Sequence, residues 1–276
     1  MLQVENVTKV FGSNAAVKDL SFAADKPQII GIIGRSGAGK STFLRMMNRM
    51  TDATEGRILI DGEDVLALKG RAKLDWQRRC AMIFQQFNLI PRLDVLTNVI
   101  LGRLNQQSVI RSSLMFFNQQ ERREALRLLD RFGVAQTALQ RAETLSGGQQ
   151  QRVAICRAMM QQPGFILADE PIASLDPLNA RLVMEALQKI NREEKITVIC
   201  NLHTLDTART YCDRVIGMRA GENVFDDVPA ALTDAMAREI YGAEAEEAFE
   251  GSITSTSLGG AASPAQPERA VDLFDG

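Results

Sequence analysis

The sequence predicts an α/β protein whose core is a mainly parallel sheet, and three observations carry that prediction. Short apolar runs rich in β-branched residues alternate with amphipathic helical patterns, which is typical of parallel strands covered by helices. A glycine-rich loop at residues 34–42 separates one such run from a helical pattern. The chain has 276 residues, of which 45% are hydrophobic, so it can form one large domain or one domain with a smaller subdomain.

The elements before and after this loop follow from hydrophobic periodicity. Residues 2–10 and 15–24 predict two strands that form an N-terminal antiparallel part, and the apolar run 28–33 predicts a buried strand. Residues 41–50 predict a helix with an apolar face. Its members are Phe43, Leu44, Met46 and Met47. The next expected elements are a strand and tight turn at 57–62, a helix at 70–79 and a buried strand at 80–84.

The pattern then changes, because residues 92–162 show helical patterns and almost no strands. We expect a helical subdomain inserted here. Asn118 and Glu121 predict a capped helix start, and the expected apolar face is Leu126, Leu128, Leu129 and Phe132. The apolar segment 103–118 has two interpretations: a hydrophobic cluster under a loop, or a patch that faces a partner.

Strands and helices alternate again toward the C-terminus. Strands are expected at 165–169, 196–201 and 214–218, and helices at 178–193 and 205–212. Beyond residue 242 the chain becomes acidic and then rich in Gly, Ala, Ser, Thr and Pro. We therefore predict one folded domain over residues 1–242 and a disordered tail over 243–276.

Composition excludes several classes of protein. The net charge of −2 does not indicate binding to nucleic acid or to an anionic membrane surface. No apolar run approaches the ~18 residues that span a bilayer, and the N-terminus lacks the pattern of a signal peptide. The four widely spaced cysteines predict free thiols of a reducing cytosol, and a single histidine argues against zinc. These residues are Cys80, Cys156, Cys200, Cys212 and His203.

The glycine-rich loop carries the strongest chemical prediction. The pattern G-x-x-x-x-G-K-[ST] matches Gly34, Arg35, Ser36, Gly37, Ala38, Gly39, Lys40, Ser41 and Thr42. Glycines let backbone N–H groups surround phosphate oxygens, and the following helix start adds positive dipole character. Lys40 would reach the β- and γ-phosphates, and the Ser41 hydroxyl would coordinate Mg²⁺. The alternative is a chance match in a glycine-rich turn, against which the flanking strand and helix argue.

A second site is expected where the strand 165–169 ends. Asp169 would hold Mg²⁺, directly or through water, and Glu170 would act as the general base for the attacking water. The alternative is a solvated acidic turn, which the preceding phosphate loop disfavours.

A second helix N-terminus that can bind an anion lies at residues 146–149, where the helical pattern at 149–161 begins. Ser146 can cap this helix, and the neighbouring glycines expose backbone N–H groups. The run continues as Gly147, Gly148 and Gln149. A plain helix cap is the alternative. Two phosphate-binding helix starts with one carboxylate site indicate that the second start serves a nucleotide on another subunit.

The run from Leu145 to Gln149, placed between the phosphate loop and the carboxylates, resembles the signature motif of ATP-binding cassette (ABC) ATPases. The resemblance covers residues 1 to about 242 and implies an ATPase with ATP and Mg²⁺, working as a homodimer that shares two ATP molecules. It also implies four residue roles. Phe11 would stack on adenine and Gln85 would sense Mg²⁺ and the attacking water, while Asp176 would belong to the interfacial D-loop and His203 would contact the γ-phosphate. A purely structural histidine is the alternative for His203.

Several runs resemble, more narrowly, the ATPase subunit of phosphonate importers. They are Gly102 to Leu104, Asp169 to Pro177, Asn201 to His203 and Arg238 to Gly242; Cys200 and Thr204-Leu205 depart from that pattern. The resemblance implies a peripheral subunit on the cytoplasmic face of the inner membrane, with transmembrane permease subunits, an indirect periplasmic solute-binding protein and no nucleic acid. The alternatives are an importer ATPase for another small solute, a non-transport ABC ATPase and a phosphate-loop kinase.

Overall fold

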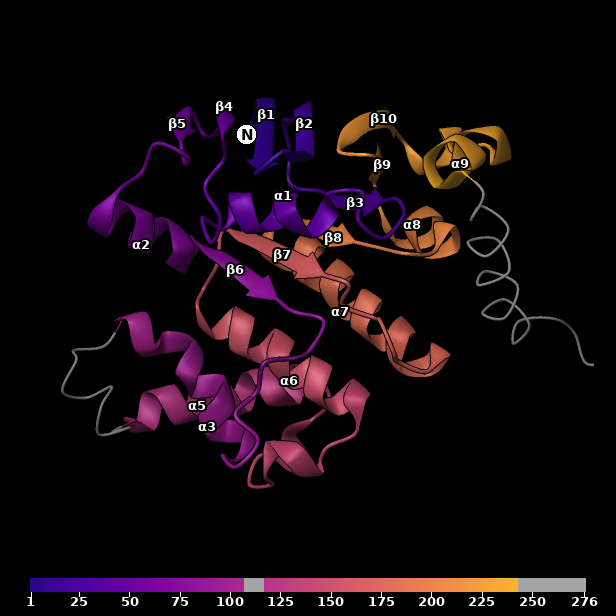
Figure 1. The fold of residues 1–276 in the computed structure, drawn as a ribbon. Helices are drawn as coiled ribbons and strands as arrows, with labels where there is room; N and C mark the ends of the chain where they lie inside the picture. The colour runs from indigo at the N-terminus through magenta and orange to yellow at the C-terminus, as the bar shows by residue number, and fades with distance from the viewer. Residues whose placement is uncertain (107–116, 243–276) are drawn as a thin grey trace, which may run out of the picture.

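The computed structural model describes residues 1–106 and 117–242, which form two sheets and the helices around them (Figure 1). Two predictions therefore lie largely outside the described residues: most of the apolar segment 103–118, and the disordered tail 243–276. Within the segment 103–118, the structure does describe Phe117, and its side chain is buried.

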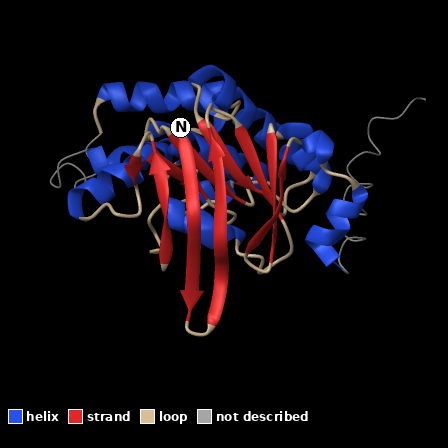
Figure 2. Cartoon of the chain, turned by 90° about the horizontal axis from the view of Figure 1, so that it is seen from above, coloured by secondary structure: helices blue, strands red, loops and turns tan. Residues whose placement is uncertain are grey.

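The first sheet is antiparallel and N-terminal, as the sequence predicted. Its order is β2 (Asn14–Ala24), β1 (Leu2–Phe11), β4 (Glu55–Ile60) and β5 (Glu63–Asp64). Figure 2 shows β1 and β2 as a long hairpin that extends past the rest of this sheet. Its inner residues are buried because they cover a helix, and its tip stays in solvent. The hairpin therefore brings Phe11, at its tip, to the surface.

The second sheet has six strands and is parallel except for one edge. Its order is β10 (Glu222–Asp227), β9 (Arg214–Arg219), β3 (Ile29–Ile33), β8 (Thr197–Asn201), β7 (Phe165–Asp169) and β6 (Cys80–Ile83), with β10 antiparallel to β9. Every residue of β3 and β8 is buried, as expected for strands covered on both faces. The predicted mainly parallel core is confirmed.

Helix α1 (Lys40–Met47) lies between the two sheets (Figure 1). All four residues of its predicted apolar face are buried, and Phe43 packs edge-on against Phe22 of the antiparallel sheet. Helix α2 (Gly70–Arg79) closes the side of this layer, where the indole N–H of Trp76 donates to the Met47 carbonyl at 2.7 Å. The phosphate loop therefore enters a helix that both sheets hold in place.

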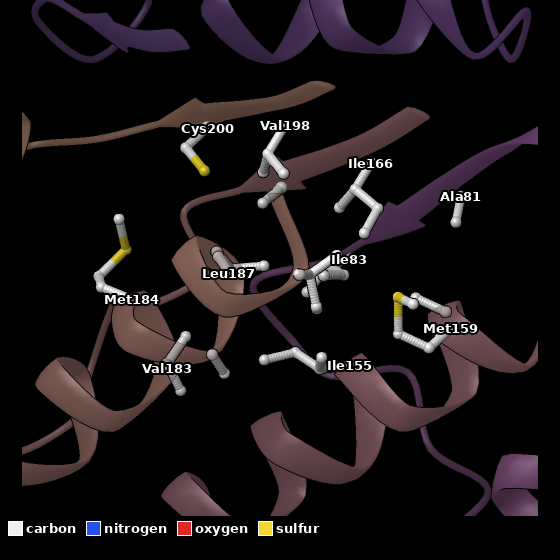
Figure 3. Close-up of a cluster of buried hydrophobic side chains, with 14 of the residues drawn as sticks. Ala81, Ile83, Ile155, Met159, Ile166, Val183, Met184, Leu187, Val198 and Cys200 are labelled. Atoms are coloured by element: carbon white, nitrogen blue, oxygen red, sulfur yellow. The ribbon is translucent and has the colours of Figure 1, made fainter. Parts of the chain in front are cut away.

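Helices α6 (Gly147–Met160) and α7 (Pro177–Glu194) cover the opposite face of the parallel sheet. Figure 3 shows that face as a cluster of buried side chains from strands and both helices. The labelled members are Ala81, Ile83, Ile166, Val198 and Cys200 from strands, Ile155 and Met159 from α6, and Val183, Met184 and Leu187 from α7. This cluster packs α6, which begins within the signature run (residues 145–149), against the strands that carry the carboxylates.

The described part of residues 92–162 contains helices and no strand element. They are α3 (Val95–Ile100), the 3-10 turns η1 (Leu101–Gln106), η2 (Ala135–Thr137) and η3 (Ala142–Thr144), α5 (Gln119–Arg131) and α6. Asn118 and Glu121 form the predicted reciprocal cap, with bonds of 2.7 and 2.8 Å. The expectation for Leu126 is wrong: 41% of it is exposed. Ala125 takes its place on the buried face, together with the predicted Leu129 and Phe132, because α5 packs on α3 and α6 along that line.

The C-terminal part contains two elements that the sequence pattern did not reveal. Strand β10 is short and polar, and helix α9 (Asp234–Tyr241) follows the turn η4 (Pro229–Ala231). Helix α8 (Leu205–Tyr211) was expected. All four cysteines lie in the described residues and are free and buried, and burial raises the pKa of Cys80 and of Cys200 to about 12.

Candidate active site

The phosphate loop leaves β3 and ends where α1 begins at Lys40, which is the strand–loop–helix context that the motif requires. Gly34, Gly37 and Gly39 have φ of 145°, 79° and 102°. A side chain could not fit at two of them. A Cβ on Gly34 would lie 2.2 Å from the Met218 carbonyl oxygen, and one on Gly39 would lie 2.2 Å from that of Ala16. The neighbouring elements therefore hold the loop in a form that only glycine permits.

Lys40 folds back over this loop. Its ammonium group donates to the carbonyl oxygens of Gly34 at 2.5 Å and Arg35 at 3.0 Å, and the residue is 4% exposed. Burial lowers the pKa of Lys40, and the carboxylates of Glu170 and Asp169 oppose that change. An anion in the loop would favour the charged form further. The lysine is thus positioned as a buried cation that lacks a directly bonded carboxylate in the described residues.

A cavity of about 460 Å³ opens above the loop. Phe11 stands at its edge with 52% exposure, and the ammonium of Lys9 lies 4.8 Å from the centre of its ring. An exposed aromatic face beside a phosphate-binding loop suits stacking on a flat heterocycle. The lining residues are Phe11, Asn14, Ala15, Ala16, Lys18, Ser36, Gly37, Ala38, Gly39, Lys40, Ser41, Thr42, Glu170 and Ala220.

The two predicted carboxylates stand where β7 ends, beside the loop. Asp169 is buried, and its Oδ1 accepts hydrogen bonds from the Ser41 hydroxyl and from the Asn201 amide, both at 2.7 Å. Glu170 has φ of 52°, a left-handed conformation that is costly for a residue with a side chain and that concentrates at functional sites. Its Oε1 lies 2.6 Å from Nε2 of His203. The structure therefore brings together four predicted residues: Ser41, Asp169, Glu170 and His203.

The sequence predicted no role in the site for Asn201, which was named only within the run Asn201 to His203. It is the residue paired with Asp169 in the parallel register of β7 and β8, and it is fully buried. Its Oδ1 has no hydrogen-bond partner in the described residues. The available signal was a lone amide at the end of an otherwise apolar strand.

Gln85, expected at the metal, lies in an exposed turn after β6 and does not line the cavity. The loop that contains it is held from α6. The Arg157 guanidinium donates to the carbonyls of Asn88 at 2.5 Å and Phe87 at 2.7 Å. In this conformation the chain keeps Gln85 outside the cavity that contains the phosphate loop.

The signature run also lies outside that cavity. Ser146 caps α6 as predicted, in a reciprocal pair with Gln149, and it is exposed. Gly148 packs on Asn179, whose Oδ1 lies 2.1 Å from where a Cβ of Gly148 would be. The same Asn179 donates to Asp176 through its amide side chain at 2.6 Å, and its hydrogen bonds lower the pKa of Asp176. Asn179 thus joins the signature run to the segment that contains Asp176.

No cluster of three or more His, Cys, Asp or Glu side chains that could hold a metal ion occurs in residues 1–106 and 117–242. The oxygen donors of Ser41 and Asp169 nevertheless fit Mg²⁺, which binds through one or two protein oxygens together with water and substrate phosphates. Among the helices of these same residues, none has the length and apolarity to cross a membrane.

The fold and this site define a nucleotide-binding cassette. The chain belongs to the ABC transporter ATPase family, whose sequence model matches residues 17–173. It is a close homologue of the phosphonates import ATP-binding protein PhnC of Rhizobium meliloti (strain 1021), with 61% identity over 94% of this chain and 92% of that protein. The protein of the same name from Ruegeria pomeroyi is 58% identical over 94% of both chains.

Solved structures agree with this assignment. The dimeric ABC transporter cassette MJ0796 matches with a TM-score of 0.74 and 32% identity, over 84% of this chain and all of that one. The ADP conformation of the cassette MJ1267 matches with a TM-score of 0.76 and 25% identity, over 91% and 98%. The predicted ABC-type fold is confirmed, and the chain is an ABC ATPase.

Proposed function

We propose that this chain is the ATP-hydrolysing subunit of a phosphonate importer. The observation that carries the proposal is the identity of 61% with a phosphonates import ATP-binding protein over nearly the whole of both chains. The nucleotide cavity is consistent with the proposal, because the phosphate loop, Lys40, the exposed ring of Phe11 and the two carboxylates are all present.

We infer a separate role in ATP hydrolysis for each residue of the site. The amides of the loop, together with Lys40 and Thr42, would hold the phosphates, and Phe11 would stack on the base. Ser41 and Asp169 would hold Mg²⁺, which neutralises charge on the phosphate oxygens. Glu170 would accept a proton from the attacking water, and His203, at 2.6 Å from Glu170, would orient that carboxylate and contact the γ-phosphate.

A second copy of the chain would complete each site. Ser146, Gly147, Gly148 and Gln149 lie away from the cavity of their own chain, and Ser146 is exposed at a helix start that can bind an anion. We propose that they contact the nucleotide of the partner copy and that Asp176 lies at the same interface. The dimeric cassette structure that this chain resembles supports the arrangement.

The importer would contain membrane-spanning permease subunits, with this chain bound at their cytoplasmic face in the inner membrane. A periplasmic solute-binding protein would deliver the solute. Permease segments would dock near Gln85, whose turn is exposed, and near the helices of residues 92–162. Closure of two copies around ATP would then move the permease.

Cells that lack this chain provide the test. We expect them to lose growth on a phosphonate as the sole phosphorus source and to keep growth on inorganic phosphate. Complementation with the wild-type chain should restore growth, and complementation with Lys40→Ala should not, because the buried cation is lost. Uptake of a labelled phosphonate, in a strain without a second phosphonate importer, measures the effect directly. Unchanged uptake would assign the chain to another small solute.

A further inference from the structure

Helix α9 ends beside the active site and is held there from two directions. Ile240 fills the space left by Gly217 of β9, where a Cβ would lie 2.5 Å from its Cδ1. Arg209 of α8 donates to the Leu232 carbonyl at 2.6 Å, just before α9 begins. The first contact holds the last turn of α9, and with it Tyr241, against the parallel sheet, and the second anchors the segment that leads into the helix.

The hydroxyl group of Tyr241 reaches the active site. It donates to the backbone carbonyl of His203 at 2.9 Å, and the residue is only 4% exposed. Burial raises the pKa of Tyr241, and the nearby Gly34 backbone opposes the change, which places the phenol close to the start of the phosphate loop. The next residue, Gly242, lies near Arg35 of that loop, because a Cβ there would be 3.9 Å from Nη1.

The backbone of His203 needs a hydrogen bond such as the one that Tyr241 donates. Beyond the end of β8, the Leu202 amide still donates a hydrogen bond to the Ile32 carbonyl of β3 at 2.9 Å, and α8 begins only at Leu205. Its helix start also lacks a side-chain cap at Thr204. The His203 carbonyl lies between these anchors and is held by Tyr241, while its imidazole lies 2.6 Å from Glu170.

We propose that Tyr241 is a positioning residue for ATP hydrolysis, whose hydroxyl holds the main chain of His203 so that its imidazole meets Glu170. Helix α9, outside the matched family segment of residues 17–173, thereby sets the geometry of the reacting groups. The inference rests on the roles proposed above for His203 and Glu170. It adds a residue that does not line the nucleotide cavity and acts through His203.

The expected kinetic effect follows from what Tyr241→Phe removes. The ring keeps its packing, and one hydrogen bond between neutral groups is lost, which corresponds to roughly a fivefold change in an equilibrium. Because the nucleotide contacts of the loop and Phe11 are unchanged, kcat should fall by about fivefold, with KM for ATP within about twofold. The melting temperature should change by no more than a few degrees, since a fully packed ring remains.

Tyr211→Phe is the matched control, because Tyr211 is the other tyrosine of the chain and does not line the cavity. Both variants are measured in the full chain, purified with its membrane partners. His203→Ala and the double variant Tyr241→Phe/His203→Ala are then compared in single-turnover assays. If Tyr241 acts through His203, the double variant should hydrolyse ATP as slowly as His203→Ala alone.

Four results would overturn the inference. Tyr241→Phe could keep the wild-type kcat. The double variant could lose a further fivefold, which would show that Tyr241 acts without His203. A rise in KM together with a large drop in melting temperature would show general loosening instead. Normal turnover of His203→Ala would refute the proposed role of His203 first and the inference with it, so the two failures are distinguishable.

Discussion

At the scale of single residues, Glu170 is held in a strained backbone conformation at the end of β7, and its carboxylate meets His203. The Glu170→Gln variant keeps the size of the side chain and removes the base. We expect hydrolysis to fall by roughly 10²–10⁴-fold, the usual scale of general base catalysis. ATP binding should persist, because Lys40, Ser41 and Asp169 are unchanged. Steady-state phosphate release and nucleotide binding, measured on the same sample, check the two parts.

A further prediction concerns Asn201, whose amide holds Asp169 at 2.7 Å. Asn201→Leu removes one of the two hydrogen bonds on that carboxylate and keeps the site filled. Residues that orient a metal ligand are typically worth 10–100-fold in metal affinity. We expect the Mg²⁺ concentration for half-maximal hydrolysis to rise by roughly that factor.

The control for this change is Asn223→Leu on β10. The side-chain Oδ1 of Asn223, like that of Asn201, is buried without a hydrogen-bond partner in the described residues. It lies on the antiparallel edge strand and should leave the Mg²⁺ dependence unchanged. An unaltered Mg²⁺ titration of Asn201→Leu would contradict a role in orienting Asp169.

At the scale of elements, Arg157 links helix α6 to the loop that contains Gln85. Phe87 and Asn88 in this loop have φ of 57° and 52°, and both carbonyls accept from the Arg157 guanidinium. The helix that begins with the signature run and the loop that follows β6 should therefore move together. This coupling would connect a permease docked near Gln85 to the nucleotide of the partner copy.

Arg157→Met should release that loop. Charge-assisted hydrogen bonds contribute about 2 kcal/mol, so we expect the melting temperature to fall by roughly 5 °C. Amide hydrogen exchange over residues 85–90 should accelerate, and hydrolysis in the assembled transporter should fall. Arg157→Lys should show the same faster exchange and slower hydrolysis as Arg157→Met, because a single ammonium cannot span two carbonyls as a guanidinium does. Arg122→Met, at an exposed position of α5, is the control. Unchanged exchange in Arg157→Met would show that the loop holds its own shape.

At the scale of the whole molecule, we propose that each ATP site is shared between two copies of the chain. The cavity contains the loop, Phe11 and Glu170, whereas Ser146 lies outside it. We therefore expect ATP to hold two copies of Glu170→Gln together, because hydrolysis no longer releases them. Light scattering with ATP should show a dimer, and size-exclusion chromatography should show the same shift.

Adding Ser146→Arg to Glu170→Gln should abolish that dimer, since the larger side chain would occupy the place of the γ-phosphate. Ser146 is exposed, so the substitution should not disturb the core. If the isolated Glu170→Gln chain stays monomeric, the same comparison is made in the complete transporter. Normal ATP hydrolysis by Ser146→Arg in that complex would refute a shared site.

The sequence by itself determined the parts of this protein whose residues are neighbours in the chain. The phosphate loop, the carboxylates that end β7 and the caps at Asn118 and Ser146 were all predicted, and the structure shows each of them in the expected local conformation. Their geometry depends on backbone dihedral angles and on hydrogen bonds within a few residues. The alternation of apolar runs and helical patterns likewise predicted the parallel core.

Only the tertiary structure decided which distant residues meet. Asn201 contacts Asp169 across 32 positions, Tyr241 contacts His203 across 38, and Arg157 contacts Asn88 across 69. The exposure of Leu126 was decided in the same way, by the line along which α5 packs. These contacts depend on strand register and helix packing, which sum many weak interactions over the whole domain and leave no local pattern in the sequence.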